Sequence, residues 1–159
     1  MMSQVLSEQT AGVRAFAGLL KAHASTTRRL NAQLVAEHGL TINDYEVLLR
    51  LARSPDRRLR RVDLADQVLL TASGITRLLD GLEQSGLVER GSCDSDRRVV
   101  YAVLTDAGLE KLREAARSHL AEVDALFAER LDQAELEQVA TLLWKLGEGD
   151  LGECEPPAA

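Results

Sequence analysis

The feature that most constrains the fold of this chain is a change of hydrophobic period at Gly86. Before it, apolar residues from Ile75 to Leu82 recur at positions i, i+3, i+4 and i+7, the spacing of one face of an α-helix. After it, residues 87–90 and the β-branched run 99–103 flank a polar segment, which is the pattern of a β-hairpin. The sequence therefore predicts a helix that runs directly into a hairpin.

A second short helix is predicted immediately before the first. Residues 60–69 place Val62, Ala65 and Leu69 on one side, and a tight turn follows. Two short helices joined in this way form a helix-turn-helix. With the hairpin as its wing, this pattern indicates a winged helix-turn-helix lobe over residues 40–105.

The lobe opens with a helix whose ends are marked by local signals. Thr41 and Asp44 have the spacing of a capping pair, and Pro55 forbids continuation of the helix. Its predicted apolar face consists of Tyr45, Leu48, Leu49 and Ala52.

Long helices are predicted on both sides of the lobe. No proline interrupts residues 9–38, and Thr105 begins a helix whose apolar positions recur every three or four residues as far as Leu131. A last helix over 133–146 repeats the pattern. One short domain cannot bury such stripes alone, which predicts a homodimer. We expect a mainly α fold with a small hairpin, in which 9–38 and 106–147 form dimerisation helices and 148–159 an acidic flexible tail.

The distribution of charge separates the lobe from its flanks. The chain carries a net charge of -6, which taken alone disfavours a nucleic-acid partner. Residues 50–100, however, hold ten arginines, no lysine and eight acidic residues, so this segment is +2 and the rest is -8. A mildly basic middle between acidic flanks is typical of a DNA-facing module on an acidic scaffold.

The second helix of a helix-turn-helix enters the major groove of DNA with its N-terminal residues. Small hydroxyl side chains and an arginine at that end can donate hydrogen bonds to phosphates and bases. The surface left free by the apolar face comprises Thr71, Ser73, Gly74, Thr76 and Arg77. For a helix in isolation, the alternative is a helix cap at Thr71 followed by ordinary exposed polar residues.

The order of these elements and their amino-acid sequences closely resemble those of the MarR (multiple antibiotic resistance regulator) family. The segments that carry the resemblance are Leu40-Thr41, Leu64-Ala65, GITRLLDGLE at 74–83, GLVER at 86–90, DRR at 96–98 and LTDAG at 104–108. The resemblance implies a sequence-specific DNA-binding regulator, with a dimer built by the terminal helices. It also implies repression or activation of nearby genes, often relieved by a small molecule. We expect a repressor that binds a pseudo-palindromic operator and is released by a small aromatic or phenolic ligand, although activation stays open.

The resemblance assigns roles at the wing. Asp96 and Arg98 occupy the positions of the family's Asp-Arg pair, in which the carboxylate orients the guanidinium toward a minor groove. Arg97 is expected on phosphate, and Arg90 either on phosphate or between the wing and the helix. Where many relatives have Asp-Pro at the tip, this chain has Cys93 and Asp94. The missing proline bears on the rigidity of the tip.

A ligand site is expected where the first, second and fifth helices meet. His23, Arg28 and Arg29 on the first helix and Tyr45 on the second would give it a cationic donor and an aromatic wall. Each residue also has an ordinary interpretation, Tyr45 as core and the others as solvated.

Two further functions stay open at this point. A winged helix used only for protein contacts would show no salt-dependent DNA affinity, and Arg77 and Arg98 would then be unexplained. A redox-sensing regulator would use Cys93 beside the arginines of the wing.

Several classes are disfavoured by what the sequence lacks. It contains no nucleophile elbow, phosphate loop or paired-carboxylate motif, so we expect neither an enzyme nor a cofactor. The three histidines have no metal-binding spacing. No apolar run is long enough to span a bilayer, and residues 1–8 lack the character of a signal peptide, so we expect a cytoplasmic protein with reduced thiols.

Overall fold

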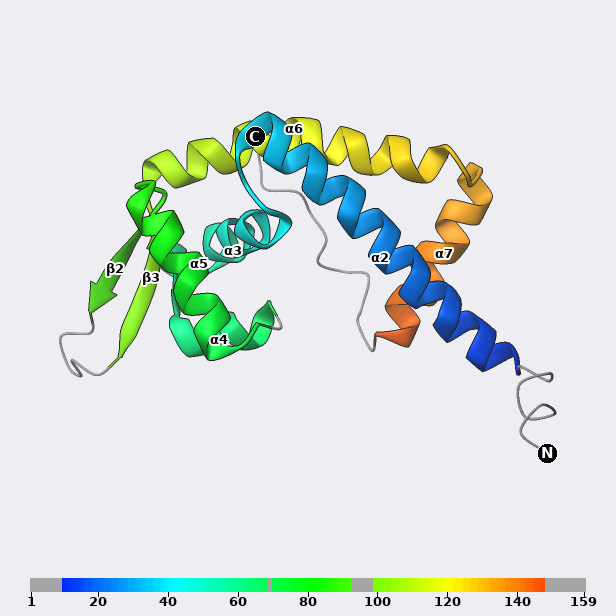
Figure 1. Ribbon diagram of the computed structural model, residues 1–159, viewed down its shortest axis with the longest axis horizontal. Coiled ribbons are helices and arrows are strands. Elements are labelled where there is room, and N and C mark those ends of the chain that lie inside the picture. Colours follow the sequence, from blue (N-terminus) through cyan, green and yellow to red (C-terminus); the bar gives the residue numbers. More distant parts are fainter. Residues whose placement is uncertain (1–9, 69, 93–98, 148–159) are drawn as a thin grey trace.

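The computed structural model describes residues 10–68, 70–92 and 99–147 (Figure 1). Its elements in chain order are α2 (Ala11–His38), α3 (Ile42–Arg53), a 3-10 turn (Pro55–Arg57), β1 (Arg58–Arg60), α4 (Arg61–Gln67), α5 (Ala72–Gln84), β2 (Val88–Ser92), β3 (Val100–Leu104), α6 (Asp106–Ala128) and α7 (Gln133–Leu146). The predicted mainly α fold with a hairpin wing is confirmed.

Figure 1 shows a lobe and an arm. The lobe contains α3, α4, α5 and the small sheet, while α6 leaves it along the top of the view and α2 and α7 descend from α6. Within the described residues, no helix is long and apolar enough to cross a membrane.

Local signals set the helix ends as predicted. The Thr41 hydroxyl accepts a hydrogen bond from the Asp44 N–H at 3.1 Å, while the Asp44 carboxylate accepts one from the Thr41 N–H at 2.8 Å. Gly39 ends α2 with a φ of 67°, a left-handed conformation that costs glycine little. These contacts fix the conformation of the short link between α2 and α3.

The wing belongs to a three-stranded antiparallel sheet with strand order β1-β3-β2. Val88 pairs with Leu104 in the predicted hairpin, and Arg58 pairs with Val103. β1 was not predicted, because it has only three residues and its partner strand lies 40 residues further along the chain. It follows a turn in which Asp56 and Arg57 both have positive φ, 54° and 53°.

The core joins the lobe to the arm. The largest fully buried side chains are Leu34, Val47, Leu48, Leu51, Leu64, Leu79 and Leu112. Leu34 belongs to α2 and Leu112 to α6, so one end of each long helix packs inside the lobe. The arm is therefore continuous with the hydrophobic core of the lobe.

The predicted apolar face of α4 needs correction, while the four residues predicted for α3 all pack in or against the core. Val62 is 65% exposed, and α4 buries Leu64 and Ala65 instead. This helix ends at Gln67 and is so short that only one side of two turns meets the core. Leu69 lies outside the described residues. On α3 the fully buried face includes Val47 and Leu51, whereas Leu49 and Ala52 are half-buried.

Candidate nucleic-acid interface

The N-terminal end of α5 presents a small polar surface. Ile75, Leu79 and Leu82 are buried and hold the opposite face of the helix against the lobe. The five residues predicted for this surface lie together there, four of them exposed and Gly74 half-buried. Because the first N–H groups of a helix lack internal partners and carry its positive dipole end, such a surface attracts phosphate.

Hydrogen bonds fix the hydroxyl groups of this surface. The Thr71 Oγ1 atom caps α5 by accepting a bond from the Gly74 N–H at 3.1 Å, and it lies 3.2 Å from the Ser73 Oγ atom. The Thr76 hydroxyl donates to the Ala72 carbonyl at 2.8 Å, which leaves its methyl group and an oxygen lone pair at the surface. The surface is thus ordered before any ligand arrives.

Arg77 is exposed, and its side chain makes no hydrogen bond or ion pair with any residue of the described ranges. Other arginines of the lobe are engaged: Arg57 lies 2.9 Å from Asp106, Arg60 2.6 Å from Asp63, and Arg90 2.7 Å from Glu83. The Arg77 guanidinium is therefore available for a base edge or a phosphate.

Arg90 connects the wing to α5. Its Nε atom donates to Glu83 at 2.7 Å, and its Nη2 atom donates to Asp80 at 2.9 Å. Arg61 also approaches Asp80, with its Nη2 atom 3.6 Å from the carboxylate. Two roles were expected for Arg90, on phosphate or between the wing and the helix. Its contacts in the described structure are of the second kind. Asp80 and Glu83 were not identified from the sequence, although their i, i+3 spacing just before the hairpin could have suggested an anchor.

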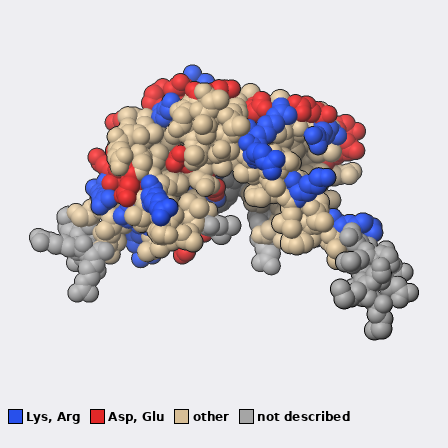
Figure 2. Space-filling view, in the orientation of Figure 1, with Lys and Arg blue, Asp and Glu red and all other residues tan. Residues whose placement is uncertain are grey.

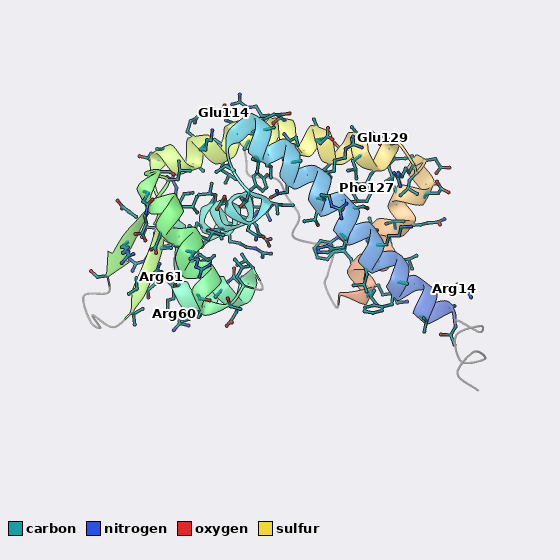
Figure 3. The ribbon with its side chains drawn as sticks, in the orientation of Figure 1. Arg14, Arg60, Arg61, Glu114, Phe127 and Glu129 are labelled. Atoms are coloured by element: carbon teal, nitrogen blue, oxygen red, sulfur yellow. The ribbon has the colours of Figure 1, made fainter. Side chains whose placement is uncertain are left out.

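β1, which is one of the two edge strands of the sheet, carries two arginines. The Arg58 guanidinium lies 4.0 Å from the centre of the Tyr101 ring, and Arg60 forms a two-pronged pair with Asp63. Figure 3 shows Arg60 and Arg61 on the lobe, far from Glu114 on α6 and from Glu129, which directly follows α6. In Figure 2, acidic side chains follow the α6 edge, while basic ones gather lower on the lobe and on the arm.

The predicted wing-tip residues Asp96, Arg97 and Arg98, together with Cys93, lie outside the described residues. The strands on either side are present, since β2 ends at Ser92 and β3 begins at Val100.

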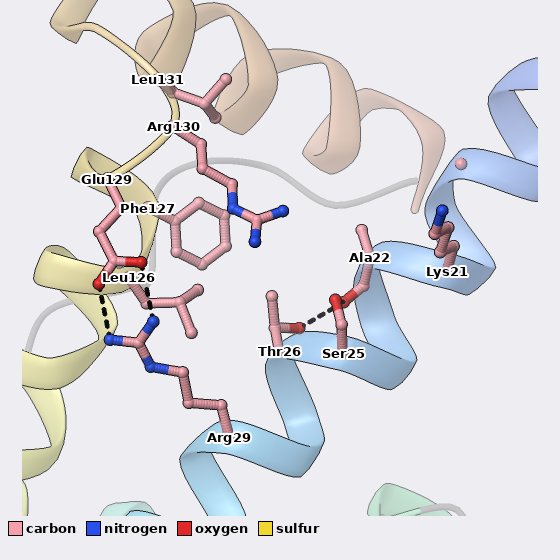
Figure 4. A pocket seen from close by; sticks show the side chains of 11 residues that line it. Lys21, Ala22, Ser25, Thr26, Arg29, Leu126, Phe127, Glu129, Arg130 and Leu131 are labelled. Carbon is pink, nitrogen blue, oxygen red and sulfur yellow. Dashed lines mark hydrogen bonds and ion pairs between the residues drawn. The ribbon is translucent and has the colours of Figure 1, made fainter.

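The residues expected around a ligand lie in different surroundings, with Tyr45 in the core and His23 and Arg28 on the surface of α2. Tyr45 is only 7% exposed, and its ring centre lies 4.6 Å from that of His119; burial raises the pKa of this tyrosine. His23 and Arg28 are exposed on α2. A cavity lies between α2 and the C-terminal end of α6 (Figure 4). Of the residues predicted for a ligand, Arg29 lines it, whereas His23, Arg28 and Tyr45 do not. Arg28 misses it because its neighbour Arg29 points there, and successive side chains on a helix diverge by about 100°.

His119 is a buried residue that packs beside the hydrophobic core. Its ring packs on Tyr45, and its Nδ1 atom lies 3.3 Å from the Gln33 amide oxygen. Burial lowers the pKa of His119. In the described ranges no group of three or more His, Cys, Asp or Glu residues is placed to hold a metal ion.

Comparison with known proteins connects this geometry to one family. The family model described as MarR family matches residues 38–99, which include the whole helix-turn-helix. The HTH-type transcriptional regulator MhqR of Bacillus subtilis (strain 168) is 30% identical over 135 residues, which cover 85% of this chain and 90% of that protein.

Solved structures agree along nearly the whole chain. AbsC, a MarR family transcriptional regulator from Streptomyces coelicolor, superposes with a TM-score of 0.76 at 34% identity, covering 89% of this chain and 95% of that one. Sco3205, a MarR family regulator from the same organism solved in complex with DNA, has a TM-score of 0.78 at 31% identity and covers 92% of both chains. These relatives are transcriptional regulators and not enzymes.

Proposed function

This chain belongs to the MarR family of winged-helix, DNA-binding transcription regulators, and from that premise we propose that it is a sequence-specific repressor. It binds a pseudo-palindromic operator as a homodimer and is released by a small aromatic or phenolic ligand. The observation that carries the proposal is the polar N-terminal face of α5, with an arginine, Arg77, that the described lobe leaves unpaired.

The proposed contacts divide between two grooves. The N-terminal face of α5 enters the major groove, where Arg77 meets a base edge and the hydroxyl groups meet phosphates. The wing reaches the minor groove with Arg98, oriented by Asp96, while Arg97 and Arg90 lie near the backbone. The residues assigned to DNA are Thr71, Ser73, Gly74, Thr76, Arg77, Arg90, Asp96, Arg97 and Arg98.

The proposed division of labour follows the lobe and the arm. Residues 40–105 bind DNA, residues 9–38 and 106–147 dimerise, and residues 148–159 form a tail. Support for dimerisation comes from large apolar side chains that a single copy leaves in water, among them Phe16 at 62% and Leu142 at 62% exposure. A second copy removes these surfaces from water. Two recognition helices of such a dimer meet successive major grooves, roughly 34 Å apart.

The testing experiment is to pass fragments of the source genome over the immobilised protein and to sequence those retained at increasing salt. A specific regulator retains a few fragments that share an inverted repeat, and its affinity falls steeply with salt. Retention of no fragment at low salt would favour a winged helix that serves protein contacts alone. Release from the retained fragment by an oxidant, and loss of that response in Cys93→Ser, would favour redox sensing instead.

A further inference from the structure

Four charged side chains from three elements meet between the wing and α5, and we call them the Asp80 cluster. Arg61 begins α4, Asp80 and Glu83 belong to α5, and Arg90 belongs to β2. The Asp80 Oδ1 atom lies 2.9 Å from the Arg90 Nη2 atom and 3.6 Å from the Arg61 Nη2 atom. We propose that Arg61 is a positioning residue for DNA binding, which pairs with Asp80 when Arg90 turns to a DNA phosphate. This inference rests on the proposed function and deepens it.

Arg61 lacks a hydrogen-bond partner at one buried nitrogen. Its side chain is 20% exposed, and its Nη2 atom is buried and makes no hydrogen bond within the described residues. The 3.6 Å to Asp80 exceeds the roughly 2.7–3.2 Å of a protein N–H···O hydrogen bond. Because a buried donor without an acceptor costs free energy, the folded chain becomes more stable if Asp80 moves slightly closer to Arg61.

Arg61 is also the cation that remains for Asp80 once Arg90 leaves it. Among the described residues, Asp80 forms ion pairs with Arg90 and Arg61, and both contacts end on the same Oδ1 atom. While Arg90 holds this oxygen, the carboxylate lies closer to the exposed arginine than to the buried one. A carboxylate released by Arg90 therefore pairs with Arg61, because a charge-assisted hydrogen bond then satisfies both groups.

Arg90 can release Asp80 and still be held on α5. Its Nε atom donates to both carboxylate oxygens of Glu83, at 2.7 Å and 3.0 Å, whereas its Nη2 atom donates to Asp80. The Arg90 side chain is 58% exposed, so a phosphate can reach the end of the guanidinium. Glu83 thus keeps the wing oriented while the Nη2 atom changes its partner.

The charge of the Asp80 cluster explains why this exchange favours DNA binding. Two arginines balance two carboxylates, so the four side chains sum to zero, whereas the three that remain without Arg61 carry one negative charge. A phosphate that approaches Arg90 repels the Asp80 carboxylate, and the Arg61 guanidinium attracts that carboxylate from its buried position. Arg61 therefore strengthens a phosphate contact that it does not make itself.

The test measures operator affinity of the full chain by fluorescence anisotropy at several salt concentrations, with a labelled duplex cut from a fragment that the parent retains. We expect Arg61→Gln to weaken binding by about tenfold and to reduce the salt slope by about one for each half-site, because Arg90 stays on Asp80 and a phosphate contact is lost. Arg50→Gln removes an arginine from an ion pair within α3 and should leave affinity and slope unchanged. An unchanged slope in Arg61→Gln, or an equal loss in Arg50→Gln, would overturn the proposal.

A double-mutant cycle with Asp80→Asn separates the exchange from simple structural support. In the Asp80→Asn background no carboxylate is left for Arg61 to receive, so adding Arg61→Gln should change operator affinity by less than about twofold. In the free protein the Arg61 Nη2 atom makes no hydrogen bond, so the same cycle on urea midpoints should show little coupling. Additive losses of operator affinity would show that Arg61 supports the lobe without the exchange. So would a coupling in unfolding as large as that in binding.

Should Arg61→Gln fail to fold, the parent itself provides the test through the NMR signals of its arginine side-chain nitrogens. The operator should shift the Arg61 Nη signals and leave the Nε signal of Arg90, which stays on Glu83. Arg61 signals that the operator leaves unchanged would overturn the exchange. A parent that binds no DNA overturns the proposed function and this inference with it. A parent that binds DNA, with variants whose losses add, overturns this inference alone.

Discussion

Arg90 on β2 and Glu83 on α5 form an ion pair of 2.7 Å that joins the wing to the recognition helix. The same guanidinium reaches Asp80 at 2.9 Å, so a single side chain holds two carboxylates of one helix face. The two DNA-contacting elements of the proposed complex are therefore oriented relative to each other before DNA is bound.

We expect Arg90→Ala to weaken operator binding several-fold at every operator variant, because the wing loses its orientation and not a base contact. Glu83→Ala should weaken binding similarly, and the double variant should be little worse than either single one. Fluorescence anisotropy over a set of operator variants measures this. Additive losses would show that Arg90 contacts phosphate independently of Glu83. Arg50→Ala, which breaks a pair within α3, is the control.

Arg77→Ala should weaken operator binding by about 1–3 kcal/mol and relax the preference at one base-pair position of each half-site. The reason is that Arg77 reads a base edge in the proposed complex. Competition binding with operators varied at each position measures both effects, and Arg117→Ala controls for the loss of one positive charge. A uniform loss across all sequences would reassign Arg77 to the phosphate backbone.

Gly108 lies where the start of α6 crosses the end of α5. A Cβ atom added there would collide with the Leu87 carbonyl oxygen, while the Thr105 hydroxyl donates to the Gly86 carbonyl at 2.7 Å. We expect Gly108→Ala to lower the free energy of unfolding by about 1–3 kcal/mol, the usual cost of overpacking. Gly81→Ala, at an exposed helical site with nothing within 4 Å, should raise it by up to about 1 kcal/mol. Urea unfolding measures both variants. Equal changes in their free energies of unfolding would contradict the close approach of Gly108 to the Leu87 carbonyl.

Dimerisation should depend on the exposed apolar stripe of α2 and on α7. Multi-angle light scattering should give twice the chain mass of 17.4 kDa at micromolar concentration. Phe16→Glu and Leu142→Glu should shift the protein toward the monomer, because each places a charge in the dimer interface. Val62→Glu, at an equally exposed valine of the lobe, should not. A parent that remains at 17.4 kDa contradicts the homodimer.

His119 should make stability depend on pH. Burial lowers its pKa below the ordinary 6.5, so the unfolded chain takes up a proton more readily than the folded one as the pH falls through 6.5. Stability is thus fully present above about pH 6.5 and declines below it, by at most about 1.4 kcal/mol per pH unit. Urea unfolding between pH 7.5 and 5.5 should show a shallower decline in His119→Gln. If the parent and His119→Gln lose the same stability over this pH range, a group other than His119 takes up the proton.

The parts of the fold that could be predicted are those with local causes. The Thr41 cap, the end of α5 before Gly86 and the hairpin are determined within a few residues of chain, and each was predicted. β1 and the exposure of Val62 depend on packing against distant segments. The α5 surface was predicted because burial of one helix face dictates the other. The partners of Arg90 could not be predicted, because they depend on how closely the wing approaches α5.

The cavity shows why its full lining could not be predicted from the sequence. Its α2 side lies close in sequence to His23 and Arg28, but its other side comes from residues 126–131, about a hundred positions later. The resemblance and the cationic residues of the first helix indicated a site there. Only the crossing of α2 and α6 decides which cation faces inward, and Arg29 does so bound to two glutamates.

The length of α6 has a consequence for operator spacing. It is one uninterrupted helix of 23 residues, with one end in the lobe and the other in the arm. Inserting a single residue would lengthen it by about 1.5 Å and turn one end against the other by about 100°. In the proposed dimer, such an insertion would change the spacing of the two half-sites that the protein can bind, while the surface of α5 proposed to read bases stays unchanged.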